Sequence, residues 1–246
     1  MAAPARFPSS RRSGRPALIA LLADAGLGAA AALGQAPWDL WFLTVAALAV
    51  LCWRIARAQG ARAAAWHGFA AGLGHFALAM SWIVEPFFVE PEIYGWMAPF
   101  ALALMAAGGA LFWTIPAWAA ARLMPGFPRQ GIGFAALIVL SDWLRGWLFT
   151  GLPWALTGHV WIDTPAGQLA AALGAIGLSA LTMLAAALPL VFWRAGLPLW
   201  RAAMPGAILS VLAIATAWSG GMARLASSLP PDTALQLRLI QPDATQ

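Results

Sequence analysis

Long apolar stretches alternate with short polar linkers along most of this chain. Seven of the stretches are long and apolar enough to cross a membrane, since a spanning helix needs roughly 17–25 mostly apolar residues. They cover about 17–34, 38–56, 65–84, 96–121, 131–149, 168–192 and 203–221. The pattern predicts an all-α polytopic membrane helix bundle with seven transmembrane helices.

The composition supports this class of protein. Hydrophobic residues make up 62% of the chain and charged residues 9%, whereas a soluble domain carries about 25% charged residues. The arginines separate apolar runs and form no exposed polar cluster, so they do not indicate nucleic-acid binding. Cys52, the only cysteine, lies inside an apolar stretch and is interpreted as a core residue. The three histidines are scattered, so we expect no metal site and no cofactor.

The linkers alternate in charge, which predicts the orientation of the bundle. One set of linkers, with the N-terminal tail, holds eleven arginines and no acid: Arg6, Arg11, Arg12, Arg15, Arg54, Arg57, Arg62, Arg122, Arg129, Arg194 and Arg201. Cytoplasmic loops carry the excess of basic residues, so this side is predicted to be cytoplasmic. The division is then a cytoplasmic tail at 1–16, a transmembrane bundle at 17–222 and a periplasmic segment at 223–246. A signal peptide is the alternative for the first stretch, but only three residues separate it from the second.

The C-terminal tail changes character. Leu235, Leu237 and Leu239 alternate with other side chains, and a period of two favours a β-strand. Because a single strand cannot fold alone, we expect a soluble domain to begin here and most of it to lie outside the 246 residues.

The stretch Ser141–Trp154 carries the clearest candidate chemistry. Asp142 and Arg145 are spaced i, i+3, which brings helix side chains together, near the predicted outer end of a span. One interpretation is a local ion pair that snorkels to the lipid headgroups. The other is a guanidinium that grips a lipid phosphate. Pro153 and Trp154 follow, either as a helix end with an interfacial anchor or as the wall of a lipid entrance.

Other outer-side residues have two interpretations each. Glu85 belongs to an acidic segment that is either an ordinary external loop or a lateral gate for a lipidated substrate. Trp143, Trp147 and Trp161 are interpreted as interfacial belt residues. His159 is interpreted as a surface residue, with substrate contact as the alternative.

Two ionisable residues lie inside predicted spans. Asp24 and His75 are expected roughly 11–15 Å deep from the cytoplasmic side, at about 1.5 Å per residue. We predict that they pair across the bundle; the alternative is that each binds backbone or hydroxyl groups. Gly68 and Gly72 share the helix face of His75, and this small-residue spacing favours close helix packing.

Several motifs occur in an order that resembles bacterial apolipoprotein N-acyltransferases. They are Gly72-Leu73-Gly74-His75-Phe76 with Ser81-Trp82-Ile83, then Trp143-Leu144-Arg145-Gly146-Trp147, Thr150-Gly151-Leu152-Pro153-Trp154, Gly158, Asp163, Leu173-Gly174, Gly177-Leu178-Ser179, and the tail Leu239-Ile240-Gln241-Pro242-Asp243-Ala244-Thr245-Gln246. The resemblance covers about residues 17–246.

The resemblance implies a bundle that carries a nitrilase-like αββα domain on the periplasmic side of the bacterial inner membrane. It implies transfer of an acyl chain from a phospholipid donor to the α-amino group of diacylglyceryl-cysteine in an apolipoprotein acceptor. In the family a Glu-Lys-Cys triad does this through a thioester acyl-enzyme, and no cofactor is implied.

The chain itself cannot supply that triad. It contains no lysine, and Cys52 lies within a span. We therefore expect no catalytic residue here, place the triad beyond Gln246, and expect residues 1–246 alone to be inactive as an acyltransferase. A small transporter and a non-catalytic membrane scaffold are the rival interpretations.

Overall fold

The computed structural model describes residues 16–227 and residue 238, and every regular element in this part of the chain is helical. The α-helices are α1 (Leu18–Ala32), α2 (Trp41–Ala56), α3 (Ala61–Ala79), α4 (Pro91–Tyr94), α5 (Ala98–Leu123), α6 (Arg129–Arg145), α7 (Ala170–Val191) and α8 (Leu199–Leu225). The 3₁₀ helices are η1 (Ser81–Phe88), η2 (Gly95–Met97), η3 (Leu148–Thr150), η4 (His159–Trp161) and η5 (Pro165–Leu169). The predicted strand at 235–240 falls outside the described residues, apart from Arg238.

Each of the seven predicted spans corresponds to one long helix, but the helices differ in how well they fit a bilayer. Three helical segments are long and apolar enough to cross: Pro91–Leu123, Pro165–Val191 and Leu199–Leu225. A fourth is α3 continued by η1, which is bent by 45° where we predicted one span over 65–84. Helices α1 and α2 are apolar but shorter, at 15 and 16 residues, and a helix of 15 residues measures only about 23 Å. The crossing of the membrane by all seven helices stays a prediction.

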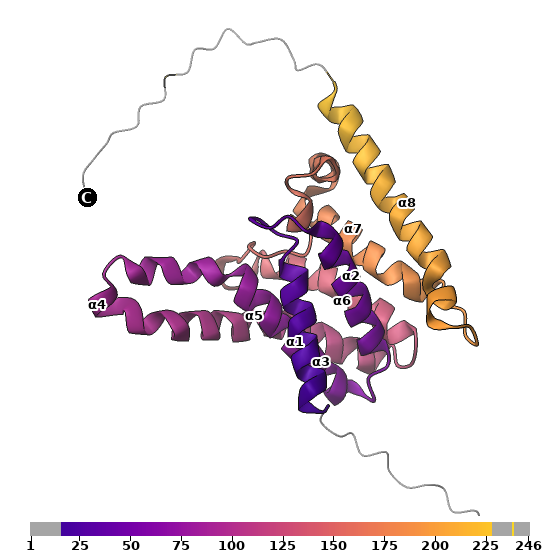
Figure 1. Cartoon of the computed structure of the whole chain (residues 1–246), viewed down its shortest axis with the longest axis horizontal. Helices are drawn as coiled ribbons and strands as arrows, with labels where there is room; N and C mark the ends of the chain where they lie inside the picture. Colours follow the sequence, from indigo (N-terminus) through magenta and orange to yellow (C-terminus); the bar gives the residue numbers. More distant parts are fainter. Residues whose placement is uncertain (1–15, 228–237, 239–246) are drawn as a thin grey trace, which may run out of the picture.

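Helix α3 is the centre of the packing, between α1 and α5. A Cβ atom added to Gly72 would lie 2.8 Å from Ala110 Cα of α5, and one added to Gly68 would lie 2.6 Å from the Trp113 carbonyl oxygen. The predicted close packing on the Gly68 and Gly72 face is therefore confirmed, with α5 as the partner. Beyond this contact, η1, α4 and the start of α5 form an arm that projects from the body (Figure 1).

The linkers gather at two opposite ends of the bundle. At one end, the loop after α2 and the loop before α6 line a common pocket, and Phe127 stacks edge-on against Trp193 with ring centroids 5.1 Å apart. At the other end, Gln35 donates to the Leu156 carbonyl at 3.2 Å, which joins the α1–α2 linker to the segment after α6. This grouping agrees with the alternation of sides predicted from the arginines.

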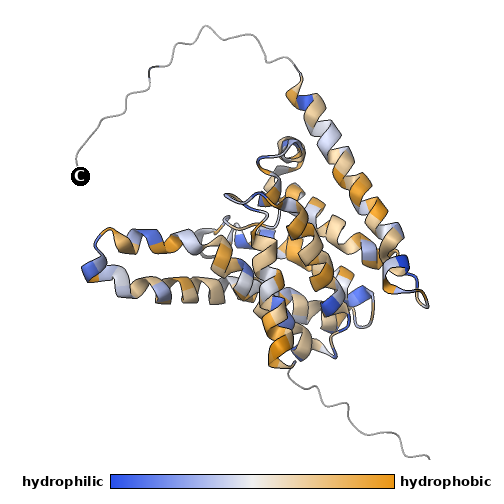
Figure 2. Cartoon of the chain, viewed as in Figure 1, coloured by the Kyte–Doolittle hydropathy of each residue, from blue (hydrophilic) through white to orange (hydrophobic). Residues whose placement is uncertain are grey.

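The outside of the bundle is apolar, as Figure 2 shows along most of α8. Ile208, Val211 and Leu212 of α8 are each more than half exposed. Cys52 is fully buried, which confirms its interpretation as a core residue.

Candidate functional site at the C-terminal end of α6

The predicted contact between Asp142 and Arg145 exists, and it is buried. Arg145 Nη2 donates to Asp142 Oδ1 at 3.0 Å, and the two residues are 1% and 2% exposed. The predicted snorkelling to the headgroups is wrong, because the guanidinium lies over the Phe76 ring, 5.0 Å from its centroid. It also donates to two backbone carbonyls, Trp154 at 2.6 Å and Ala155 at 3.1 Å. Contact of Arg145 with a lipid phosphate stays a prediction.

Asp142 anchors the segment that follows α6. Its Oδ2 accepts from Thr157 N at 3.0 Å, Thr157 Oγ1 at 2.8 Å and Ser179 Oγ at 2.9 Å. The Ser179 hydroxyl oxygen in turn accepts from Gly158 N at 3.2 Å. A buried charge is tolerated only when it is paired and hydrogen-bonded, and this carboxylate has four donors. The Asp142–Arg145 pair therefore ties α6, residues 154–158 and α7 into one rigid unit.

The turn between α6 and residues 154–158 depends on Gly151. Its φ is +91°, and an added Cβ would lie 2.5 Å from the Gly146 carbonyl oxygen, so no other residue fits without strain. Leu152 N donates to the Arg145 carbonyl at 2.8 Å, which closes the turn. Pro153 and Trp154 are then displayed on the outside, with Trp154 52% exposed.

Trp154 also connects this turn to the arm. Its ring centroid lies 6.2 Å from that of Trp82, which belongs to η1 and is itself 49% exposed. The motif Ser81-Trp82-Ile83 does not by itself indicate the contact of Trp82 with Trp154. No local pattern identifies Thr157, because it lies 15 residues after Asp142 and the turn alone brings the two together.

Below the turn lies a large apolar groove of about 770 Å³. Its wall is one face of α5, closed by one residue of η1 and two residues after α6: Ile83, Ala101, Leu104, Met105, Gly108, Gly109, Leu111, Phe112, Ile115, Leu148 and Leu152. Leu104 and Ile115 are 75% and 62% exposed, so the groove is open along its side. From Ala101 to Ile115 it follows α5 for about 21 Å, at a rise of about 1.5 Å per residue.

A smaller pocket of about 190 Å³ lies beside Trp82 and Trp154, lined also by Gln35, His159 and Asp163. His159 is half-buried rather than a surface residue. Burial lowers the pKa of His159 below its ordinary value of 6.5, while the charge of Asp142 raises it and that of Arg145 lowers it. The predicted alternative of substrate contact stays open for this residue.

The remaining residues that were predicted to lie on the outer side divide into exposed and buried. Glu85 is exposed on η1, two residues after Ile83 of the groove, and its role as part of a lateral gate stays a prediction. Trp143 and Trp147 are 48% and 74% exposed. Trp161 is fully buried and donates from Nε1 to Thr182 Oγ1 at 2.8 Å, so its interpretation as a belt residue is wrong.

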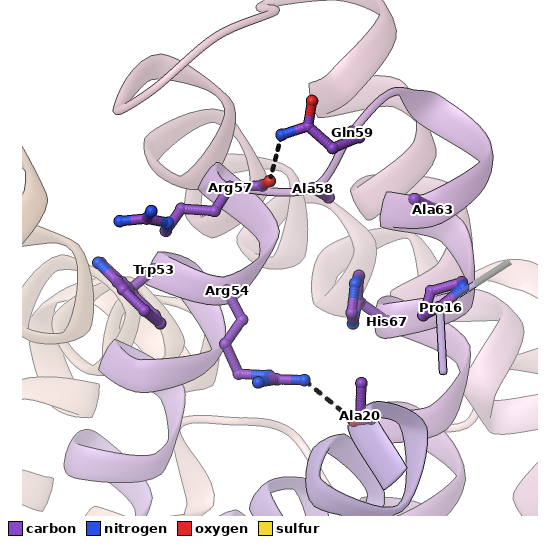
Figure 3. Close-up of a pocket in the computed structure, with 9 residues that line it drawn as sticks. All are labelled: Pro16, Ala20, Trp53, Arg54, Arg57, Ala58, Gln59, Ala63 and His67. Carbon is purple, nitrogen blue, oxygen red and sulfur yellow. Dashed lines mark hydrogen bonds between the residues drawn. The ribbon is translucent and has the colours of Figure 1, made fainter. Parts of the chain in front are cut away.

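The predicted pairing of Asp24 with His75 is also wrong. Asp24 is fully buried, forms an ion pair with Arg54 of α2, and accepts from His67 Nδ1 at 2.6 Å. His75 Nε2 instead donates to the Ala155 carbonyl at 3.3 Å. The physical reason is distance along the bundle: Arg54 and His67 lie near the same helix ends as Asp24, whereas His75 lies two turns beyond His67. Arg54 and His67 line the pocket drawn in Figure 3.

Residues 16–227 contain no group of three or more His, Cys, Asp or Glu side chains placed to hold a metal ion. This end of the bundle offers a buried polar anchor, an open apolar groove and a small pocket that contains His159 and Asp163. The fold and this site define a helical membrane protein with a surface suited to lipid.

Comparison with known proteins gives the family. Residues 27–188 match the family described as apolipoprotein N-acyltransferase N-terminal domain. The apolipoprotein N-acyltransferase of Caulobacter vibrioides is 37% identical over 186 residues, which are 75% of this chain and 34% of that protein. The one of Rhodopseudomonas palustris is 32% identical over 239 residues, 94% of this chain and 43% of that protein. The chain belongs to the apolipoprotein N-acyltransferase family, and it spans less than half the length of these relatives.

Proposed function

We propose that this chain is the membrane part of an acyltransferase that moves an acyl chain from a phospholipid to the N-terminal amine of diacylglyceryl-cysteine in apolipoproteins. The relatives named above are apolipoprotein N-acyltransferases. The thioester-forming triad would belong to a periplasmic nitrilase-like domain after Gln246, and the cytoplasmic side would be the arginine-rich end. The observation that carries the proposal is the apolar groove along α5. The groove ends at Leu148 and Leu152, beneath the turn that follows α6. We call residues 148–154 the anchored turn, because Arg145 and Asp142 hold the segment that follows it.

In this proposal the groove holds acyl chains in a hydrocarbon environment, and the anchored turn sets where the ester emerges. Leu104 and Ile115 on the open side let a chain enter laterally from the bilayer. The Asp142–Arg145 pair acts as a positioning device, because it fixes the turn that closes the groove. Holding a reactant in one geometry removes much of the entropy cost of the reaction.

The residues of this chain do not perform the chemical steps in this proposal. Cys52 is fully buried within α2, and an inert buried thiol cannot attack an ester. Purified residues 1–246 should therefore form no thioester with a labelled phospholipid; a labelled Cys52 would contradict the proposal.

The groove can be tested by filling it. A Cβ atom on Gly108 meets nothing within 4 Å, so Gly108→Trp places an indole in the groove without a clash at its base. A phospholipid with a photoreactive acyl chain should crosslink to the wild-type α5 near Leu104 and Leu111, and at least tenfold less to Gly108→Trp. In the complete enzyme the same change should reduce acyl transfer.

The matched control is Gly220→Trp, since Gly220 is also helical and open, on α8. Its crosslinking should equal that of the wild type. Equal labelling of both tryptophan variants, or labelling confined to helices other than α5, would refute the groove as the acyl site.

A further inference from the structure

A second pocket lies at the opposite, arginine-rich end of the bundle. It measures about 340 Å³ and opens between α2 and the first turns of α1 and α3 (Figure 3). Its lining is basic and apolar: Pro16, Ala20, Trp53, Arg54, Arg57, Ala58, Gln59, Ala63 and His67. No carboxylate lines it, because Asp24 is fully buried behind Arg54.

Asp24 holds two of the lining side chains in fixed orientations. Arg54 Nε pairs with Asp24 Oδ1, and Arg54 Nη2 donates to Asp24 Oδ2 at 3.2 Å and to the Ala20 carbonyl at 3.0 Å. Among the described residues Arg54 Nη1 has no hydrogen-bond partner, and the Arg54 side chain is still 23% exposed. His67 gives Nδ1–H to Asp24, which leaves Nε2 for a ligand. The carboxylate thus preorganises a guanidinium edge and an imidazole.

Arg57 adds a second positive charge at the rim. Its guanidinium lies over the Trp53 ring, 5.0 Å from the centroid. Among residues 16–227 no carboxylate lies within salt-bridge distance of it. Asp24 balances one of the two arginines, so Arg57 leaves the pocket with a net positive charge.

We propose that this pocket binds a phosphate group, with Arg54 at its floor and Arg57 at its rim. A planar guanidinium matches phosphate geometry through paired hydrogen bonds. The neighbouring surface of α1 is apolar, with Leu18, Ile19 and Leu22 between 62% and 81% exposed. A phospholipid would place its chains along that surface while its phosphate enters the pocket. A free phosphate would use the same hydrogen bonds and not the apolar surface.

The site is independent of acyl transfer and lies at the other end of α3 from the anchored turn. Its role in the fold is separable from its role in binding. The Asp24–Arg54–His67 cluster joins α1, α2 and α3, whereas Arg57 is exposed and makes no ion pair in the described part of the chain. Arg57 is therefore the residue to change.

The test uses the purified chain, stripped of lipid in an uncharged detergent, with three probes at matched ionic strength. They are a soluble short-chain phosphatidylglycerol, the diacylglycerol with the same chains, and inorganic phosphate. The groove along α5 also takes acyl chains in the proposed function, so these titrations use Gly108→Trp, which fills that groove. In this background, calorimetry should show saturable binding of a phosphate-bearing probe and none of the diacylglycerol. Binding of the lipid alone identifies a headgroup site, and equal binding of inorganic phosphate identifies a free-anion site.

The variants decide whether the pocket is responsible. Arg57→Gln should raise the dissociation constant about tenfold, the loss expected for one charge-assisted contact. Arg201→Gln is the matched control, since Arg201 also stacks on a tryptophan, 4.7 Å from the Trp200 ring, but lines no such pocket. It should leave binding unchanged.

Two outcomes would overturn the site: no binding of either phosphate probe, or equal weakening by Arg57→Gln and Arg201→Gln. Arg54→Lys gives a second measurement, because it keeps the charge beside Asp24 and removes the planar fork. Arg54→Lys should weaken binding of the phosphate probe. The melting temperature of the protein should stay unchanged, because the ion pair with Asp24 is retained.

Discussion

Replacing Asp142 with asparagine tests the anchor at the C-terminal end of α6 with almost no change in volume. In the native protein Oδ1 accepts from Arg145, and Oδ2 accepts from Thr157 N, Thr157 Oγ1 and Ser179 Oγ. Asparagine has one acceptor oxygen and one donor amide, so whichever way it turns, donors face donors on one side. In either orientation the buried guanidinium of Arg145 loses its only carboxylate partner among the described residues.

The expected cost of Asp142→Asn is large for a change of one atom. Removing one partner of a buried ion pair costs about 3–5 kcal/mol, because the other charge stays buried and uncompensated. Ser179→Ala removes a single bond to the carboxylate and should cost about 1.5–3 kcal/mol. The two effects should not add in the double variant, because both act on the same network.

The measurements are reversible unfolding in mixed micelles and limited proteolysis of residues 151–164. Asp142→Asn should lower the free energy of unfolding by the stated amount and expose the segment to cleavage. Asp163→Asn is the control, since Asp163 is exposed and forms no ion pair among the described residues; it should change little. A loss below about 1 kcal/mol in Asp142→Asn, the size typical of an exposed pair, would refute the anchoring role.

Further predictions concern other parts of the same end. Gly151→Ala and Gly126→Ala both place a side chain at a φ of +91°, but only at Gly151 does the added Cβ meet a carbonyl oxygen, at 2.5 Å. Gly151→Ala should therefore lower the melting temperature more than Gly126→Ala, and equal shifts would contradict the close approach. Trp161→Phe loses the hydrogen bond to Thr182. It should lower the free energy of unfolding by about 1–3 kcal/mol, because the buried hydroxyl loses its indole donor. Adding Thr182→Val to Trp161→Phe should not restore the packing that the indole provided. His159 has a lowered pKa in the folded state. Its contribution to stability should therefore be constant above pH 6.5 and decrease as the pH falls below 6.5. His159→Asn should lack this decrease, and the same dependence of stability on pH in the wild type and the variant would contradict the prediction.

The positions of the helices could be predicted from the sequence because apolar stretches are a local property. So could the Asp142–Arg145 contact, since the i, i+3 spacing within one helix brings the side chains together whatever the fold. The close helix packing at Gly68 and Gly72 could also be predicted from the sequence, although the partner helix α5 could not. The sequence did not predict that α3 bends by 45° into η1, which then packs against α5.

The partners of the buried charges were decided only by the tertiary structure. Asp142 meets Ser179 across 37 residues, and Asp24 meets Arg54 and His67 across 30 and 43 residues. Hydropathy places such residues at a depth but does not say which neighbouring helix presents a donor there. Depth alone suggested His75 for Asp24, whereas the approach of α1, α2 and α3 at their arginine-rich ends selected two other residues.

The sequence by itself determined that the chain forms apolar helices with charged ends, because an apolar helix buries its own backbone polar groups and needs no distant partner. The groove along α5, the anchored turn above it and the basic pocket at the other end arose only from packing. Each is made by side chains from three or more elements, so its shape and charge exist only once those elements are in contact.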